Sequence, residues 1–332
     1  MIVGLVLVLL ATFFQGTFLL PMALTRKWAW EHTWAVFSLF AMWLLNWTLA
    51  WALLPDPWRL YASIPRSDLL LLILFGAAWG CGAVLFGLGM DKLGLTLGYP
   101  LIMGLNAAAG ALVPLLWFGR GDLLSPRSLV VISGTAVALA GIVLCSIAGA
   151  ARSRPAQVVD GARPAFASGL AIGVAAGCLS CLPNIGLTFA ASVVSTARGM
   201  GASVAQAGNA VWAVFFTVAG VVNLAYCGLR MVRNRNFHFF SAPGSLRNLG
   251  LGVIMSLMWI GSFYCYGAGT ARLGVWGPLA GWPILMCGSI GVGVLWGLWK
   301  GEWKNAPARA GRLLGAGLLL ILLAVLLLAF AS

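Results

Sequence analysis

Long apolar runs alternate with short polar segments along the whole chain. A transmembrane helix needs about 20 consecutive apolar residues, whereas a membrane β-strand needs about ten with alternating polarity. The runs are too long for such strands and show no period of two, so they predict helices. The first run lacks a preceding basic segment and is too long for the apolar core of a signal peptide, so it counts as a span. The ten predicted spans are 2–23, 33–54, 69–90, 95–118, 128–150, 166–190, 203–229, 246–269, 274–299 and 310–331.

Composition supports an all-α membrane protein. Of the 332 residues, 61% are hydrophobic and only 8% are charged, whereas a soluble domain carries roughly 25% charged residues. The 43 glycines and 16 tryptophans suit packed membrane helices with interfacial anchors. This composition excludes a soluble domain, a disordered chain, a disulfide scaffold and a nucleic-acid-binding domain. We attribute the net charge of +13 to residues that set membrane orientation.

Basic residues are distributed unequally between the two sets of loops. The four even-numbered loops hold Arg59, Arg66, Arg120, Arg127, Arg198 and Arg272. The five odd-numbered loops hold Arg26, Lys27, Lys92, Arg152, Arg154, Arg163, Arg230, Arg233, Arg235, Arg247, Lys300, Lys304, Arg309 and Arg312. Because basic loops stay in the cytoplasm, this asymmetry places the odd-numbered loops there and both termini on the periplasmic side.

The two halves of the chain resemble each other at an offset of 180 residues. The matched positions are Trp79 with Trp259, Gly87 with Gly267, Gly89 with Gly269, Leu93-Gly94 with Leu273-Gly274, and Arg120-Gly121-Asp122 with Lys300-Gly301-Glu302. Five spans per half is an odd number, so the halves must have opposite orientations. We therefore predict a 5+5 inverted repeat: a first repeat at 1–150, a cytoplasmic linker at 151–165 and a second repeat at 166–332. Transporters of this architecture bind substrate at the midplane between the repeats.

Few residues in the predicted spans are suited to catalysis. The two histidines, His32 and His238, are expected in loops, and the seven acidic residues lie in loops or at span ends. Cys178 and Cys181 form a single C-x-x-C without a second pair or a nearby histidine, so no metal site is expected. The sequence therefore favours a protein that is not an enzyme and needs no cofactor.

Uncharged hydrogen-bonding and aromatic side chains lie at mid-depth in the spans. An amide both donates and accepts hydrogen bonds, and an aromatic face can cover the apolar face of a sugar ring. A set of this kind without charge suits a neutral polyhydroxylated solute, since an ionic substrate would need an intramembrane counter-charge. The simpler interpretation of each amide is an interhelical hydrogen bond. The candidate substrate-binding residues are Gln15, Trp79, Asn106, Asn184, Trp259, Tyr266 and Trp282; Asn46, Asn209, Asn223 and Tyr264 lie at similar depth.

Two proline positions predict broken helices near the middle of the membrane. Pro183 directly precedes Asn184, and Pro283 directly follows Trp282. A broken helix frees backbone groups that can bind substrate. We therefore expect interruptions in the sixth and ninth spans.

Several segments resemble the L-rhamnose–proton symporters of the drug/metabolite transporter superfamily. These segments are Arg26-Lys27-Trp28-Ala29-Trp30-Glu31, Leu53-Leu54-Pro55-Asp56-Pro57-Trp58, Phe75-Gly76-Ala77-Ala78-Trp79-Gly80, Gly87-Leu88-Gly89-Met90, and Lys300-Gly301-Glu302-Trp303-Lys304-Asn305. The resemblance implies a bacterial inner-membrane sugar carrier driven by protons. It also implies that spans 1–4 and 6–9 surround the substrate while spans 5 and 10 are peripheral. The last span would face lipid or, in a homodimer, a second copy of the chain.

Proton coupling needs a group whose proton affinity changes during transport. Glu31 is the first candidate, because it lies at the start of the second span beside Trp28, Trp30 and Trp34. The simpler alternative is that Glu31 caps this span or pairs with a basic neighbour, Arg26 or Lys27. Asp91 is the second candidate. Two other functions stay open: export of another small metabolite on the same fold, and a membrane sensor that transports nothing.

Overall fold

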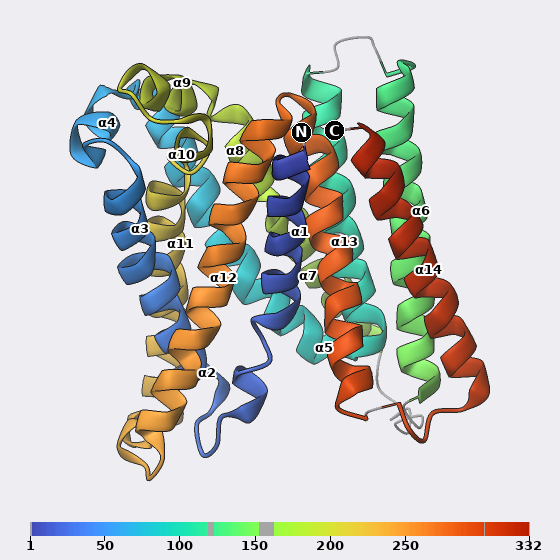
Figure 1. The fold of residues 1–332 in the computed structure, drawn as a ribbon. Helices are drawn as coiled ribbons and strands as arrows, with labels where there is room; N and C mark the ends of the chain where they lie inside the picture. The colour runs from blue at the N-terminus through green and yellow to red at the C-terminus, as the bar shows by residue number, and fades with distance from the viewer. Residues whose placement is uncertain (1, 119–122, 153–162, 302, 332) are drawn as a thin grey trace. The chain divides into compact units, whose positions relative to one another are not determined.

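The computed structural model describes residues 2–118, 123–152, 163–301 and 303–331, apart from the side chains of 90, 91, 94–97, 99, 100, 118, 163–166 and 331. Within these residues all regular structure is helical (Figure 1). The α-helices of the first half are α1 (Ile2–Thr17), α2 (Trp30–Ser38), α3 (Leu45–Leu53), α4 (Pro57–Ser63), α5 (Arg66–Phe118) and α6 (Pro126–Arg152). Those of the second half are α7 (Arg163–Ser180), α8 (Leu182–Phe189), α9 (Ala191–Gly199), α10 (Val204–Ala207), α11 (Trp212–Asn234), α12 (Ser245–Leu273), α13 (Trp276–Trp299) and α14 (Ala308–Ala331).

Nine helical segments in the described residues are long and apolar enough to cross a membrane, and Leu101–Trp117 forms a shorter apolar one. These ten segments match the ten predicted spans, which confirms an all-helical membrane protein. The third and fourth spans are parts of one helix, α5, which has 53 residues. At 1.5 Å per residue, such a helix has an axis about 80 Å long, which accommodates two apolar segments for a hydrocarbon core roughly 30 Å thick. Two crossings also require the helix axis to turn between the third and fourth spans.

The interruptions of the spans differ in part from those expected. The sixth span is broken at Cys181, between α7 and α8 and just before Pro183, as predicted. The ninth span continues through Pro283 as α13, so the predicted break there is wrong. A membrane helix tolerates proline when its neighbours satisfy the freed backbone groups. Three interruptions were not predicted: a turn after α1 in the first span, before the 3₁₀-helix η1 (Met22–Leu24); a π-helix, η2 (Leu39–Leu44), in the second; and a turn between α10 and α11 in the seventh.

The chain forms two compact units, and each unit combines segments from both halves of the sequence. Unit 1 comprises Gly82–Ile185 and Leu273–Ser332, and unit 2 comprises Ile2–Cys81 and Gly186–Arg272. A compact unit of the fold need not coincide with a duplicated segment of the sequence. The division into two units therefore does not test the predicted repeats, which stay a prediction. Residues 153–162 of the predicted linker, ten of its fifteen, lie outside the described part of the chain.

Small residues hold the fifth and tenth spans together in unit 1. In Figure 1, α6 and α14 lie side by side. A Cβ atom on Gly317 of α14 would lie 2.6 Å from the Cys145 sulfur and 2.9 Å from the Gly141 carbonyl oxygen of α6, so the absence of a side chain permits this contact. The buried positions of α14 recur every three or four residues: Ala310, Leu314, Gly317, Ile321, Ala324 and Leu328. The last span therefore packs one face on α6 and leaves the opposite face exposed.

Candidate sugar-binding and proton-binding sites

Three of the predicted substrate-binding residues meet in unit 1. The Trp282 indole nitrogen on α13 donates to the backbone carbonyl and the side-chain oxygen of Asn106 on α5, at 3.1 and 3.2 Å. The Asn184 amide on α8 donates to the carbonyls of Gly110 and Pro278, at 2.7 and 3.0 Å. These bonds connect α5, α8 and α13. Asn184 thus gives the Gly110 carbonyl a donor that Pro114, four residues later in α5, cannot supply.

Aromatic side chains form a cluster in unit 2 around two of the predicted residues, Trp79 and Trp259. Their ring centroids are 5.7 Å apart. Trp259 is buried, with the Phe216 ring at 4.8 Å and the Phe37 ring at 5.3 Å, whereas Trp79 is partly exposed. Tyr266, seven residues after Trp259 on α12, is fully buried. Of these three residues, Trp79 is the one with ring surface left for a ligand.

Three buried oxygen atoms in unit 2 have no hydrogen-bond partner among the described residues. They belong to Gln15 on α1, Ser38 on α2 and Ser262 on α12. Both α1 and α2 contact α12: Phe37 packs on the Trp259 ring, and a Cβ on Gly261 would lie 3.5 Å from Phe14. Since buried polar atoms are almost always paired, these three oxygens have hydrogen-bonding capacity that would suit a hydroxylated ligand. The sequence interpretation named Gln15 and missed both serines.

The other mid-membrane amides are engaged in hydrogen bonds within unit 2. Asn46 donates to the carbonyls of Met42, Trp212 and Ala213, and the Tyr264 hydroxyl lies 2.9 Å from the Asn46 carbonyl. Asn209 and Asn223 accept from the indoles of Trp212 and Trp34, at 3.0 and 2.9 Å. For Asn46 and Asn223 the simpler interpretation, an interhelical bond, is the one that the structure supports, whereas the bonds of Asn209 are local to residues 205–212.

Glu31 lies in the first turn of α2 and is only 1% exposed. Its Oε1 accepts hydrogen bonds from the side-chain amides of Asn234 at 2.9 Å and Asn236 at 2.7 Å. Its Oε2 lies 3.8 Å from Nε of Arg230 on α11. The partner is thus Arg230 rather than Arg26 or Lys27, which corrects the pairing considered from the sequence. Three donors around a buried carboxylate stabilise its ionised form in this conformation.

The end of α11 has the geometry that brings both asparagines to Glu31. Arg235 adopts a left-handed conformation with φ of 51°, and its N–H donates to the Val232 carbonyl. The next N–H, that of Asn236, donates back to the Met231 carbonyl at 3.2 Å. This pair of bonds is a Schellman motif, which reverses the chain directly after the helix. The reversal places Asn236 under the start of α2, on the same carboxylate oxygen as Asn234.

His32 is the functional candidate that sequence reasoning missed. The expectation that both histidines lie in loops is wrong for His32, which follows Glu31 on α2 and is completely buried. Its Nε2 lies 2.9 Å from the backbone carbonyl oxygen of Asn236. His32 lies at the boundary of a predicted span, where the apolar pattern does not show whether a side chain is buried. Its burial results from the tertiary fold alone. Asp91, the second proton candidate, has a side chain outside the described part of the structure.

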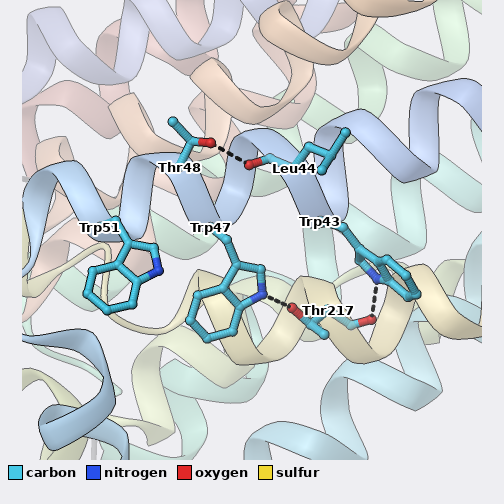
Figure 2. Close-up of a pocket in the computed structure, with 6 residues that line it drawn as sticks. All are labelled: Trp43, Leu44, Trp47, Thr48, Trp51 and Thr217. Atoms are coloured by element: carbon cyan, nitrogen blue, oxygen red, sulfur yellow. Dashed lines mark hydrogen bonds between the residues drawn. The ribbon is translucent and has the colours of Figure 1, made fainter.

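A shallow pocket of about 460 Å³ lies on unit 2 (Figure 2). Trp43, Trp47 and Trp51 line it at intervals of four residues, together with Leu44, Thr48 and Thr217. The indoles of Trp43 and Trp47 both donate to Thr217, at 3.0 Å to its carbonyl and 2.8 Å to its hydroxyl. Since these polar groups already bond to each other, the groove is mainly apolar and suits a sugar poorly. Nearby, Tyr61 of α4 donates to Ala210, and burial raises the pKa of its phenol above the usual range.

Comparison with known proteins identifies the family. The family described as L-rhamnose-proton symport protein (RhaT) matches residues 1–331. The L-rhamnose-proton symporters of Yersinia pestis (strain Pestoides F) and Yersinia pseudotuberculosis serotype O:3 (strain YPIII) are each 28% identical to this chain over 330 residues. The aligned region covers 97% of this chain and 96% of each relative. The expectation of a secondary transporter rather than an enzyme is thereby confirmed. The chain belongs to the L-rhamnose-proton symport protein family.

Proposed function

We propose that this protein carries a small neutral sugar of the rhamnose type across the bacterial inner membrane together with protons. The observation that carries the proposal is the family match over 331 residues of a chain with membrane-length helices. Alternating access, in which the two sides of the membrane reach the site in turn, is the mechanism that this architecture supports.

Contacts between equivalent residues support the proposed inverted repeat. Trp79 and Trp259, which the offset of 180 residues relates, have rings 5.7 Å apart in unit 2. Asn106 and Met286, related by the same offset, are hydrogen bonded in unit 1 at 3.3 Å. Residues related by a pseudo-twofold axis meet each other only close to that axis. The two pairs thus favour the drug/metabolite transporter fold, with repeats at 1–150 and 166–332.

The protein groups best suited to bind the sugar are those with an unpaired hydrogen-bonding atom or an exposed ring surface. Gln15 has an unpaired buried oxygen, and Trp79 keeps part of its ring exposed. Trp259 and Tyr266 would support this surface from within unit 2. Within unit 1, Asn106, Asn184 and Trp282 form a separate candidate group, whose present bonds would have to rearrange to admit a sugar. Both sets fit a neutral ligand, since neither contains a charged side chain.

For the proton, Glu31 is the proposed coupling residue. A carboxylate that is 1% exposed is costly unless its partners stay in place. If transport separates α2 from Asn234, Asn236 and Arg230, the carboxylate loses its donors and gains a proton instead. One conformation would thus hold the ionised form and the other the neutral form.

The outer face of α14 is the surface that we propose to meet the bilayer or, in a homodimer, a second copy of the chain. This face carries the exposed side chains of Leu319, Leu322, Leu326 and Phe330. Both termini are proposed to lie on the periplasmic side.

Transport by purified protein in proteoliposomes tests the function. We expect uptake of radiolabelled L-rhamnose above its external concentration when the pH is lower outside, and exchange of preloaded sugar without a gradient. Sugar binding without flux would favour the sensor. Exchange of another metabolite in preference to rhamnose would favour the exporter of the same fold. Rhamnose uptake unaffected by a pH gradient would exclude proton coupling.

A further inference from the structure

The environment of His32 is closed and aromatic. Its ring centroid lies 4.8 Å from that of Phe240, 5.5 Å from Phe239 and 6.2 Å from Trp28. Phe239 and Phe240 belong to the short 3₁₀-helix η3 (Phe237–Ser241), which follows the turn at the end of α11. His32 thus lies in a completely buried environment formed mainly by aromatic rings.

The hydrogen bonding of His32 defines which nitrogen is open to a proton. The Asn236 carbonyl oxygen only accepts, so Nε2 at 2.9 Å carries the hydrogen. In the neutral ring Nδ1 is then an acceptor, and it has no hydrogen-bond partner among the described residues. The side-chain oxygen of Asn236 is also unpaired. A buried lone pair that no protein group uses is the position at which a proton would bind.

Asn236 connects this histidine to the carboxylate of Glu31. Its backbone carbonyl accepts from His32, while its side-chain amide donates to Glu31 at 2.7 Å. The charged and titratable groups on the elements around His32 include Glu31 on its own helix, Arg230 on α11, and His238 on η3. Arg230 pairs with Glu31 at 3.8 Å, and His238 contacts Phe239, with ring centroids 4.7 Å apart. Asn236 thus bridges the His32 imidazole and the Glu31 carboxylate.

We propose that His32 is a second proton-binding residue of the transport cycle, which takes a proton at Nδ1 while Asn236 couples it to Glu31. The step forms one N–H bond, breaks none in the protein, and takes its proton from water. The inference rests on the proposed proton symport, but the binding of a proton by His32 can be measured without any sugar.

The chain offers a clean spectroscopic test because it contains only two histidines. The His238→Gln variant, purified without a polyhistidine tag and labelled with ¹⁵N-histidine, leaves His32 as the sole imidazole. We expect its Nδ1 resonance in lipid nanodiscs to change from the unprotonated to the protonated position between pH 8 and pH 5. Adding Glu31→Gln should alter the His32 resonances, because Asn236 bonds to both residues. A ring that stays neutral over the whole range overturns the proposal.

A transport assay gives the second readout. His32→Gln keeps an amide that can donate to the Asn236 carbonyl but cannot titrate. We expect this variant to exchange sugar within threefold of the wild-type rate and to lose at least tenfold of pH-driven accumulation. His238→Gln, at an exposed position, is the matched control and should retain both activities. Accumulation by His32→Gln at the wild-type level overturns the proposal, whereas failure of the wild type to transport rhamnose overturns only the proposed substrate.

Discussion

At the scale of single residues, the structure distinguishes polar side chains whose hydrogen bonds join helices from those that have an unpaired hydrogen-bonding atom. Asn46 bonds to three carbonyl oxygens, whereas the buried Gln15 oxygen has no partner among the described residues. Both residues look alike in the sequence: an amide in the middle of an apolar run. Their difference depends on neighbours that lie far away in the chain, such as Trp212 and Ala213.

The comparison of Gln15 with Asn46 leads to a prediction about sugar binding. We expect Gln15→Leu to weaken L-rhamnose binding by one to two decades while leaving thermal stability near that of the wild type. The loss corresponds to roughly 1–3 kcal/mol for one buried hydrogen bond to the ligand. Asn46→Leu should instead lower the melting temperature, since it removes the hydrogen bonds that link α3 to the Trp212 and Ala213 carbonyls of α11. Calorimetric titration and a thermal unfolding scan measure the two effects. Unchanged affinity in Gln15→Leu would remove this residue from the site.

A second residue-level prediction concerns Glu31. We expect Glu31→Gln to abolish sugar accumulation driven by a pH gradient but to preserve exchange, because the amide keeps some hydrogen bonding yet cannot carry the proton. The control is Asp56→Asn: Asp56 caps α4 by accepting from the Arg59 N–H, and asparagine can do the same. Accumulation by Glu31→Gln at the wild-type level would show that the coupling proton binds elsewhere.

At the scale of elements, helix pairs are defined by close contacts rather than by hydropathy. The tenth span reads as a uniform leucine-rich run, yet α14 packs through a row of small and branched residues on α6. Lipid tails are as apolar as leucine, so the packing of small and branched side chains, not hydrophobicity, favours one face of an apolar helix such as α14 over another. The sequence therefore predicted the span but not its partner.

This contact predicts how two neighbouring glycines differ. We expect Gly317→Leu to destabilise the protein by roughly 1–3 kcal/mol, because its side chain would overlap Cys145 and the Gly141 carbonyl. Gly315→Leu, on the same helix, meets no atom within 4 Å of its new Cβ and should have little effect. Thermal unfolding of the two variants in detergent gives the comparison. Equal melting temperatures would contradict the packing of α6 on α14.

At the scale of the whole molecule, orientation is the property that the sequence addresses most directly. The odd-numbered loops contain fourteen basic residues, whereas the even-numbered loops contain six. The prediction concerns Gln157 and Ser332, which lie outside the described residues. In a background without the seven native cysteines, we expect a cysteine at 332 to react with an impermeant thiol reagent in intact cells. A cysteine at 157 should react only after lysis. The reverse pattern would place the termini in the cytoplasm.

The apolar pattern by itself determined the class of the protein and the positions of the spans, because in a bilayer every span must satisfy its own backbone and face lipid or another helix. Motif resemblance likewise gave the transport family. The interruptions at η2 and between α10 and α11, the partner of Glu31 and the burial of His32 were decided only by tertiary structure. The contact between Arg230 and Glu31 joins residues 199 positions apart, and Asn236 approaches His32 only after a left-handed turn at Arg235. Hydropathy measures the affinity of a side chain for the membrane, whereas these features depend on which polar groups the folded chain brings within hydrogen-bond distance.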